Sequence, residues 1–204
     1  MRAYLRAGLA VFNAGDFHDA HDAWEAHWLD LPEGSDDERL LHGLIQFTAA
    51  YFHARERNWE GCVGLAESAG AYLAGLPDDY RGVDVARCRR ILAELARDPA
   101  VVDRRAPPRL THEGRVVTLA DLDFEEAVVA ARVYADAGPY DEDVVESAIG
   151  FAQADRAAET GGRFVRLVVD FATDPENRDL VYQRLRGHVS KREHRESDVD
   201  GLFG

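Results

Sequence analysis

Two histidines, a glutamate and a glutamine in the first part of the chain have residue types and spacing suited to chemistry. His21 and Glu25 are four positions apart, which puts both side chains on one face of an α-helix. Histidine and carboxylate side chains act as general acids and bases and as ligands of divalent metals. We therefore take His21, Glu25 and His53 as candidate catalytic residues and as candidate metal ligands, with Gln46 as a weaker partner.

Helical periodicity predicts that His21 is buried. At about 100° per residue, the apolar side chains of a helix over residues 17–31 gather on one face, and His21 projects from the middle of them. Glu25 lies at the edge of that face, whereas Asp22 points the opposite way. We therefore expect a buried histidine beside solvated acidic neighbours.

The helix expected over about residues 36–57 is apolar almost all round and should be the central element of a bundle. Its remaining stripe contains His42, Gln46, Ala49 and His53. The loop before it is short, so the helix over residues 17–31 should be its neighbour. The histidine and glutamate of that neighbour would then meet Gln46 and His53 in a mostly apolar setting.

The residue types leave three interpretations of this cluster open. The four side chains can satisfy one another's hydrogen bonds and fix the register of the helices. They can bind a divalent metal such as zinc, manganese or iron. They can also bind a small ligand or catalyse a reaction without metal, with one histidine as general base and Glu25 orienting it. The candidate ligand-binding residues are Trp24, Trp28, Gln46 and Asn58, although aromatic residues at helical spacing more often form a core.

The remaining elements predict an all-α protein. Ser35 to Glu38 and Asp123 to Glu126 have the spacing of a capping box, and Asn58 can cap the helix that follows it. Helices are expected over about residues 3–14, 17–31, 36–57, 59–76, 83–97, 123–138, 141–159, 163–173 and 175–196.

The pattern changes between residues 104 and 121. Two short runs of strand-forming residues flank the turn His112-Glu113-Gly114-Arg115, which predicts a small β-hairpin or an extended linker. The sequence thus divides into a helical bundle over residues 1–105, a hairpin or linker over 106–120 and a helical extension over 121–204.

An internal repeat suggests a different function. The segment that begins Phe12-Asn13-Ala14 recurs, with two residues inserted, from Phe52-His53-Ala54 onward. Each copy spans the end of one helix, a tight turn and the start of the next, as in tetratricopeptide-like helix hairpins. The alternative is therefore a protein–protein interaction module whose polar cluster is purely structural. A ligand site requires that water reaches the cluster, whereas the alternative predicts a sealed core.

The charge balance restricts the partners. The 204 residues include 38 acidic and 24 basic ones, the net charge is -14, and Lys191 is the only lysine. This composition resembles that of proteins from salt-loving microbes, in which dense carboxylates maintain hydration. It argues against nucleic acids and anionic membranes as partners, because their phosphates would be repelled. A protein partner or a homo-oligomer is compatible with it.

The sequence also indicates a compartment. No stretch is apolar enough for a membrane helix or a signal-peptide core, so we expect a cytoplasmic protein. Cys62 and Cys88 lie in helical contexts without a CxxC motif or a Cys/His ladder. Their context predicts two buried free thiols and neither a disulfide nor a zinc site.

Over about residues 9–76 the sequence resembles the domain of unknown function 309 family. The resemblance rests on the stretch from Phe12 to Trp28, on Gly43-Leu44-Ile45-Gln46 and on a following histidine, asparagine and glycine. The positions that match the family pattern are His21, Glu25, Trp28, Gln46, His53, Asn58 and Gly61. Family members commonly carry His-Glu where this chain has His21-Asp22. The resemblance implies a small helical bundle and no established activity, and it does not extend to residues 121–204.

Overall fold

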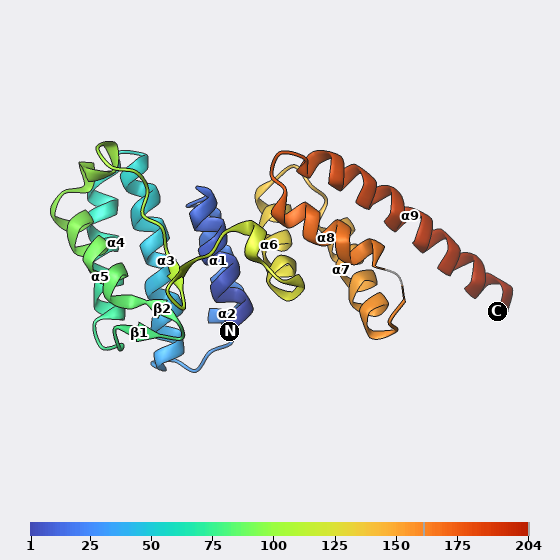
Figure 1. Cartoon of the computed structure of the whole chain (residues 1–204), viewed down its shortest axis with the longest axis horizontal. Helices are drawn as coiled ribbons and strands as arrows, with labels where there is room; N and C mark the ends of the chain where they lie inside the picture. Colours follow the sequence, from blue (N-terminus) through green and yellow to red (C-terminus); the bar gives the residue numbers. More distant parts are fainter. Residues whose placement is uncertain (161, 204) are drawn as a thin grey trace. The chain divides into compact units, whose positions relative to one another are not determined.

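The computed structural model describes the backbone of residues 1–160 and 162–203, and the side chains of these residues up to 195. The chain forms two compact units, the first over Met1–Leu122 and the second beginning at Asp123. Both consist mainly of helices, which confirms the all-α prediction (Figure 1). Within the described residues, no helix is long and apolar enough to cross a membrane.

The first unit is a helical bundle. In Figure 1, α3, α4 and α5 run side by side, and α2 packs on both α1 and α3. Its helical elements are α1 (Arg2–Ala14), the 3₁₀ turn η1 (Asp19–His21), α2 (Asp22–Trp28), α3 (Asp36–Arg55), α4 (Trp59–Leu73), α5 (Val85–Arg97), and the 3₁₀ turns η2 (Pro99–Asp103) and η3 (Leu119–Asp121).

The predicted caps at Ser35 and Asn58 are confirmed, but the capping box expected at Ser35 is only half formed, because the Glu38 side chain accepts from the Trp28 indole instead. The Ser35 hydroxyl accepts a hydrogen bond from the Glu38 amide at 3.2 Å and opens α3. The Asn58 side chain accepts one from the Gly61 amide at 3.1 Å and opens α4. These bonds satisfy amides that have no partner within the helix, so local sequence is sufficient to fix both helix starts.

One continuous helix over residues 17–31 was the wrong expectation. Residues 19–21 form the 3₁₀ turn η1, and α2 extends only from Asp22 to Trp28. A 3₁₀ turn rotates the chain by about 120° per residue, against about 100° in an α-helix. A wheel drawn for a single α-helix therefore misplaces the side chain of His21.

An aromatic cluster around Phe12 joins α1 to α3. The centroid of the Phe12 ring lies 4.9 Å from that of Phe17, 5.5 Å from that of Phe47 and 5.6 Å from that of Tyr51. Phe12 and Phe47 are fully buried.

The two free thiols, Cys62 and Cys88, are buried as predicted.

Four two-residue strands form a small antiparallel sheet in chain order. They are β1 (Asp79–Tyr80), β2 (Val83–Asp84), β3 (Thr111–His112) and β4 (Arg115–Val116). The turns Arg81-Gly82 and Glu113-Gly114 have positive φ at both central residues, as type I′ hairpins require. The second hairpin confirms the prediction. The first one, and its pairing to the second through Val83 and His112, had not been predicted.

The side chain of Asn13 attaches the segment around the second hairpin to the bundle. Its Nδ2 donates to the carbonyl oxygens of Leu110 at 2.8 Å and Val117 at 2.9 Å, and its Oδ1 accepts from the Leu110 amide at 2.8 Å. Asn13, Leu110 and Val117 are all buried. In the structure, the segment therefore belongs to the first unit.

The second unit contains α6 (Phe124–Ala137), α7 (Glu142–Ala157), α8 (Arg163–Thr173) and α9 (Arg178–Phe203). Asp123 and Glu126 form the predicted capping box at the start of α6. The helix expected from Pro175 begins at Arg178 instead, because the Asp174 side chain accepts the Asn177 amide in a turn. The core of the second unit includes Ala148, Ile149, Val168, Phe171 and Leu185.

Asn13→Ala should lower the free energy of unfolding by about 2–4 kcal/mol, because buried backbone groups at Leu110 and Val117 lose their partners. Urea denaturation measures this loss. Asn177→Ala is the matched control: this asparagine is exposed in a surface turn, so its replacement should cost less than about 1 kcal/mol. Equal losses for the two variants would contradict the role assigned to Asn13.

A fragment of residues 1–122 should be more stable than one of residues 1–105. The longer fragment retains Leu110, Val117, Leu119 and Leu122, which are buried, and each buried side chain of this size contributes about 1.5–3 kcal/mol. Calorimetry of the two fragments compares their melting temperatures. Identical melting temperatures would show that residues 106–122 do not stabilise the bundle.

Candidate functional site

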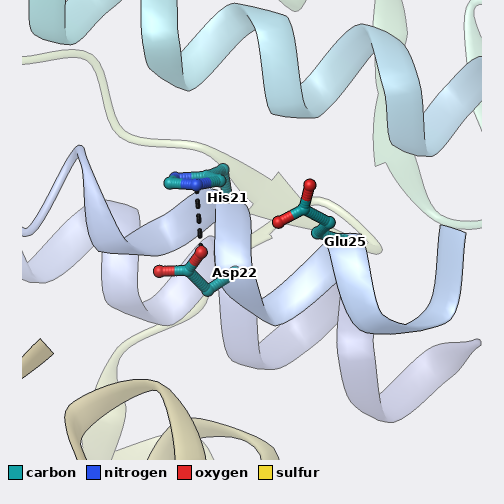
Figure 2. A group of neighbouring side chains, drawn as sticks. All are labelled: His21, Asp22 and Glu25. Atoms are coloured by element: carbon teal, nitrogen blue, oxygen red, sulfur yellow. Dashed lines mark ion pairs between the residues drawn. The ribbon is translucent and has the colours of Figure 1, made fainter. Parts of the chain in front are cut away.

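His21, Asp22 and Glu25 lie together where η1 meets α2. His21 is the last residue of η1, Asp22 is the first of α2, and Glu25 follows almost one turn later. One potential ligand atom from each lies within 4.8 Å of the other two. Figure 2 shows the imidazole paired with the Asp22 carboxylate and the Glu25 carboxylate beside them. The structure thus groups His21 with Glu25 as predicted and adds Asp22.

The prediction that His21 is buried is wrong, because its side chain is only partly buried. The His21 side chain is 26% exposed, the Asp22 side chain is 29% exposed, and Glu25 is exposed. The 3₁₀ geometry of residues 19–21 accounts for the difference, because it turns His21 away from the face calculated for an α-helix. The same geometry brings Asp22 to the imidazole.

Both ring nitrogens of His21 have defined partners. Nδ1 contacts the His18 carbonyl oxygen, a contact in which Nδ1–H must be the donor because a carbonyl only accepts. Nε2 lies 2.9 Å from Asp22 Oδ1. The backbone therefore fixes the ring orientation and directs Nε2 toward the carboxylates.

The hydrogen bond to Asp22 raises the pKa of His21 from 6.5 to about 9. Partial burial opposes this shift, whereas the bond to the His18 carbonyl and the charge of Glu25 add to it. The imidazole is therefore protonated at neutral pH. Any cation that binds Nε2 must displace this proton.

His53 belongs to a separate hydrogen-bonded turn. Its Nδ1 accepts from Asn58 Nδ2 at 2.8 Å, and Asn58 in turn caps α4. A Cβ at position 61 would lie 2.7 Å from Asn58 Nδ2, so a larger residue there would displace the side chain that caps α4. Within the part of the chain that the structure describes, His53 is not a member of the ligand group around His21. His53 and Asn58 thus position the α3–α4 connection.

Gln46 joins a third group of polar side chains, along α3. Gln46 Nε2 lies 3.0 Å from His42 Nε2, and His42 Nδ1 lies 3.3 Å from Glu38 Oε1. The Trp28 indole donates to the same Glu38 oxygen at 2.8 Å. Sequence reasoning placed His42 on the same stripe as Gln46 but took neither His42 nor Glu38 as a site residue. Their spacing of four residues, continued by Gln46, is the signal that could have found them.

The two tryptophans chosen as candidate ligand-binding residues, Trp24 and Trp28, have different surroundings. Trp28 lines an open hollow together with His42 and Tyr72, whose rings stack at a centroid distance of 3.9 Å. Trp24 is fully buried, and its indole lies where a Cβ at Gly8 would approach within 2.3 Å. Trp24 is therefore a core residue. The prediction that it lines a ligand groove is wrong.

The predicted cluster is thus divided among three places. The group around His21 is partly exposed, and the polar chain of α3, whose members bond one another, borders the open hollow at Trp28. A protonated imidazole between exposed carboxylates can exchange its proton for a metal ion. Among the described residues, the group at His21 is the one in which three potential ligand atoms lie within 4.8 Å of one another.

The family model described as "Domain of unknown function (DUF309)" matches residues 5–65. This match confirms the family resemblance of the N-terminal part of the chain. A curated protein from Aquifex aeolicus (strain VF5), described as an uncharacterized protein, is 28% identical over 91 residues. The aligned region covers 45% of this chain and 27% of that relative, so the chain matches about a quarter of the relative's length. All residues of the His21 group lie within the family match.

Asp22→Asn should lower the pKa of His21 toward its ordinary value, because the largest cause of its elevation is removed. Since the folded-state pKa is raised, the stabilisation is full below about pH 6.5 and is lost as pH rises through about 9. The loss at pH 6 should stay below about 1 kcal/mol, because water screens this exposed pair. NMR titration of the imidazole measures the pKa. Asp30→Asn, at an exposed aspartate, should leave it unchanged.

Proposed function

We propose that the first unit binds a divalent metal ion through His21, Asp22 and Glu25. The observation that carries this proposal is the convergence of three ligand atoms within 4.8 Å at the start of α2. Two oxygens and one imidazole nitrogen form a donor set that suits zinc and manganese. His53, the third ligand suggested by the sequence, is replaced by Asp22.

The distances are close to those of a loaded site. Zinc ligands lie about 2.0–2.2 Å from the ion, so two of them are at most about 4.4 Å apart. His21 Nε2 and Asp22 Oδ1 are already 2.9 Å apart. The Glu25 ligand atom lies within 4.8 Å of the other two. A rotation of the Glu25 side chain, without movement of the helix, is therefore enough to bring it within binding distance of the same ion.

The orientation of His21 also supports the proposal. Metal-binding imidazoles usually donate their second ring nitrogen to a carbonyl or carboxylate, which sets the tautomer. His21 Nδ1 contacts the His18 carbonyl oxygen in this way, so Nε2 is the nitrogen available to a metal. Three protein ligands would leave a coordination position for water or a substrate, at which a bound metal acts as a Lewis acid.

Exposure distinguishes this function from the interaction module with a structural cluster. The interaction-module alternative predicts that the polar cluster lies in a sealed core. In the structure, the side chains of His21 and Glu25 reach solvent. The family pattern to which residues 9–76 are similar has glutamate where this chain has Asp22. Either residue supplies a carboxylate beside the histidine, as the metal site requires.

Isothermal titration of the full chain with Zn²⁺ should show one saturable site. Binding at pH 7 should release about one proton per ion, because His21 is protonated there, and the affinity should rise about tenfold per pH unit up to about pH 9. Measuring the binding heat in buffers of different ionisation enthalpy gives the proton count. Absence of stoichiometric binding would reject the proposal.

Matched variants test the ligand set. His21→Ala, Asp22→Asn and Glu25→Gln should each weaken zinc binding at least about tenfold. His53→Ala and Glu33→Gln should leave the affinity unchanged, because neither residue belongs to the group. Loss of binding in His53→Ala together with full binding in Asp22→Asn would favour the ligand set drawn from the sequence over the one proposed.

A further inference from the structure

A hollow in the same unit contains no residue of the His21 group and is separate from the hollow at Trp28. Its volume is about 450 Å³, and it lies beside α5, bordered by η2 and by the segment that leads to β3. Its volume is within the range of small-molecule sites, about 300–1,000 Å³. Its most unusual feature is four arginines, Arg87, Arg90, Arg105 and Arg109.

The four arginines differ in how they are satisfied. Arg105 pairs with Glu94 at 2.6 Å, and Arg109 donates to the Asn13 carbonyl oxygen. The Nε atom of Arg87 is buried and has no hydrogen-bond partner. Arg90 is exposed, and among the described residues it makes no ion pair. Within the described part of the chain, neither Arg87 nor Arg90 has a carboxylate partner, so both guanidinium groups can pair with an anion in the hollow.

The charge of the lining is opposite to that of the whole chain. Four guanidinium groups and one carboxylate, Glu94, line the hollow in a chain whose net charge is -14. The cationic excess exceeds what a singly charged carboxylate neutralises, so a dianion fits better. The planar guanidinium fork matches the oxygens of a phosphate.

Apolar side chains make up much of the remaining surface. Tyr51, Ile91 and Leu95 line the hollow next to the arginines, and Val101 and Val102 of η2 contribute a further wall. Leu95, Val101 and Val102 are almost completely buried, so the wall is part of the core and is preformed. A ligand that fills the hollow therefore needs an apolar portion as well as an anionic head.

We propose that this hollow binds a small phosphate ester with an apolar or aromatic body. The phosphate contacts Arg87 and Arg90, and the body lies against Tyr51, Ile91 and Leu95. The concave shape and the small volume exclude a nucleic acid duplex, whose phosphates the acidic surface elsewhere would also repel. The site is independent of metal binding at His21.

The test titrates the full chain with phenyl phosphate at low ionic strength and follows binding by calorimetry and by the melting temperature. We expect saturable binding at one site. Inorganic phosphate should bind at least about tenfold more weakly because it leaves the apolar wall uncovered, and benzoate more weakly because it carries one charge. No binding of phenyl phosphate, or tighter binding of benzoate, would overturn the proposal.

Variants separate a built site from diffuse attraction between an anion and arginines. Arg87→Gln and Arg90→Gln should each lower the affinity for phenyl phosphate at least about tenfold. Arg90 is exposed, so its variant should fold even if that of Arg87 does not. Arg97→Gln is the matched control, because Arg97 is an exposed arginine of the same helix outside the hollow. Equal effects of Arg90→Gln and Arg97→Gln would overturn the proposal.

Discussion

The hydrogen bonds of the Asn13 carboxamide are the constraint on which the first unit depends most. A buried backbone amide or carbonyl needs a partner, and Leu110 and Val117 lie just outside the paired residues of β3 and β4, where Asn13 supplies one. The carboxamide provides one acceptor and two donor contacts in the geometry of a short strand. The backbone of Asn13 also accepts from Arg109. The sheet and the wall of the arginine-lined hollow are therefore positioned from one residue at the end of α1.

Local chemistry explains why much of the fold follows from the sequence. Capping by Ser35, Asn58 and Asp123 involves residues three positions apart, so the pattern alone specifies these helix starts. The turn Glu113-Gly114 likewise selects its hairpin locally. Prediction from the sequence becomes wrong where two local conformations, such as a 3₁₀ turn and an α-helix, are close in energy. The chain from His18 to Asp22 forms a 3₁₀ turn before α2, and a rotation difference of about 20° per residue was enough to misplace His21.

Contacts between distant residues were not accessible to the same reasoning. The pairing of Val83 with His112 joins a hairpin that the sequence predicted to one that it did not. The hollow joins Tyr51 of α3 with Arg87 of α5 and with Arg109, which no periodicity relates. His21 and Glu25 were identified because they are four residues apart. Asp22 was missed because a residue next to His21 reaches its ring only through the local 3₁₀ geometry.

Almost all cationic side chains of this acidic chain are arginines, and four of them line the hollow beside α5. Arginine pairs with both oxygens of a carboxylate, as Arg81 does with Asp37 through contacts of 2.8 and 2.6 Å. Each such pair neutralises part of a surface that carries 38 acidic residues, so a cation placed elsewhere leaves repulsion among carboxylates unrelieved. Arg87 and Arg90 nevertheless line a hollow where Glu94 already has Arg105 as its partner. In a chain with so few cations, this placement is costly for stability alone, and an anionic ligand would offset the cost.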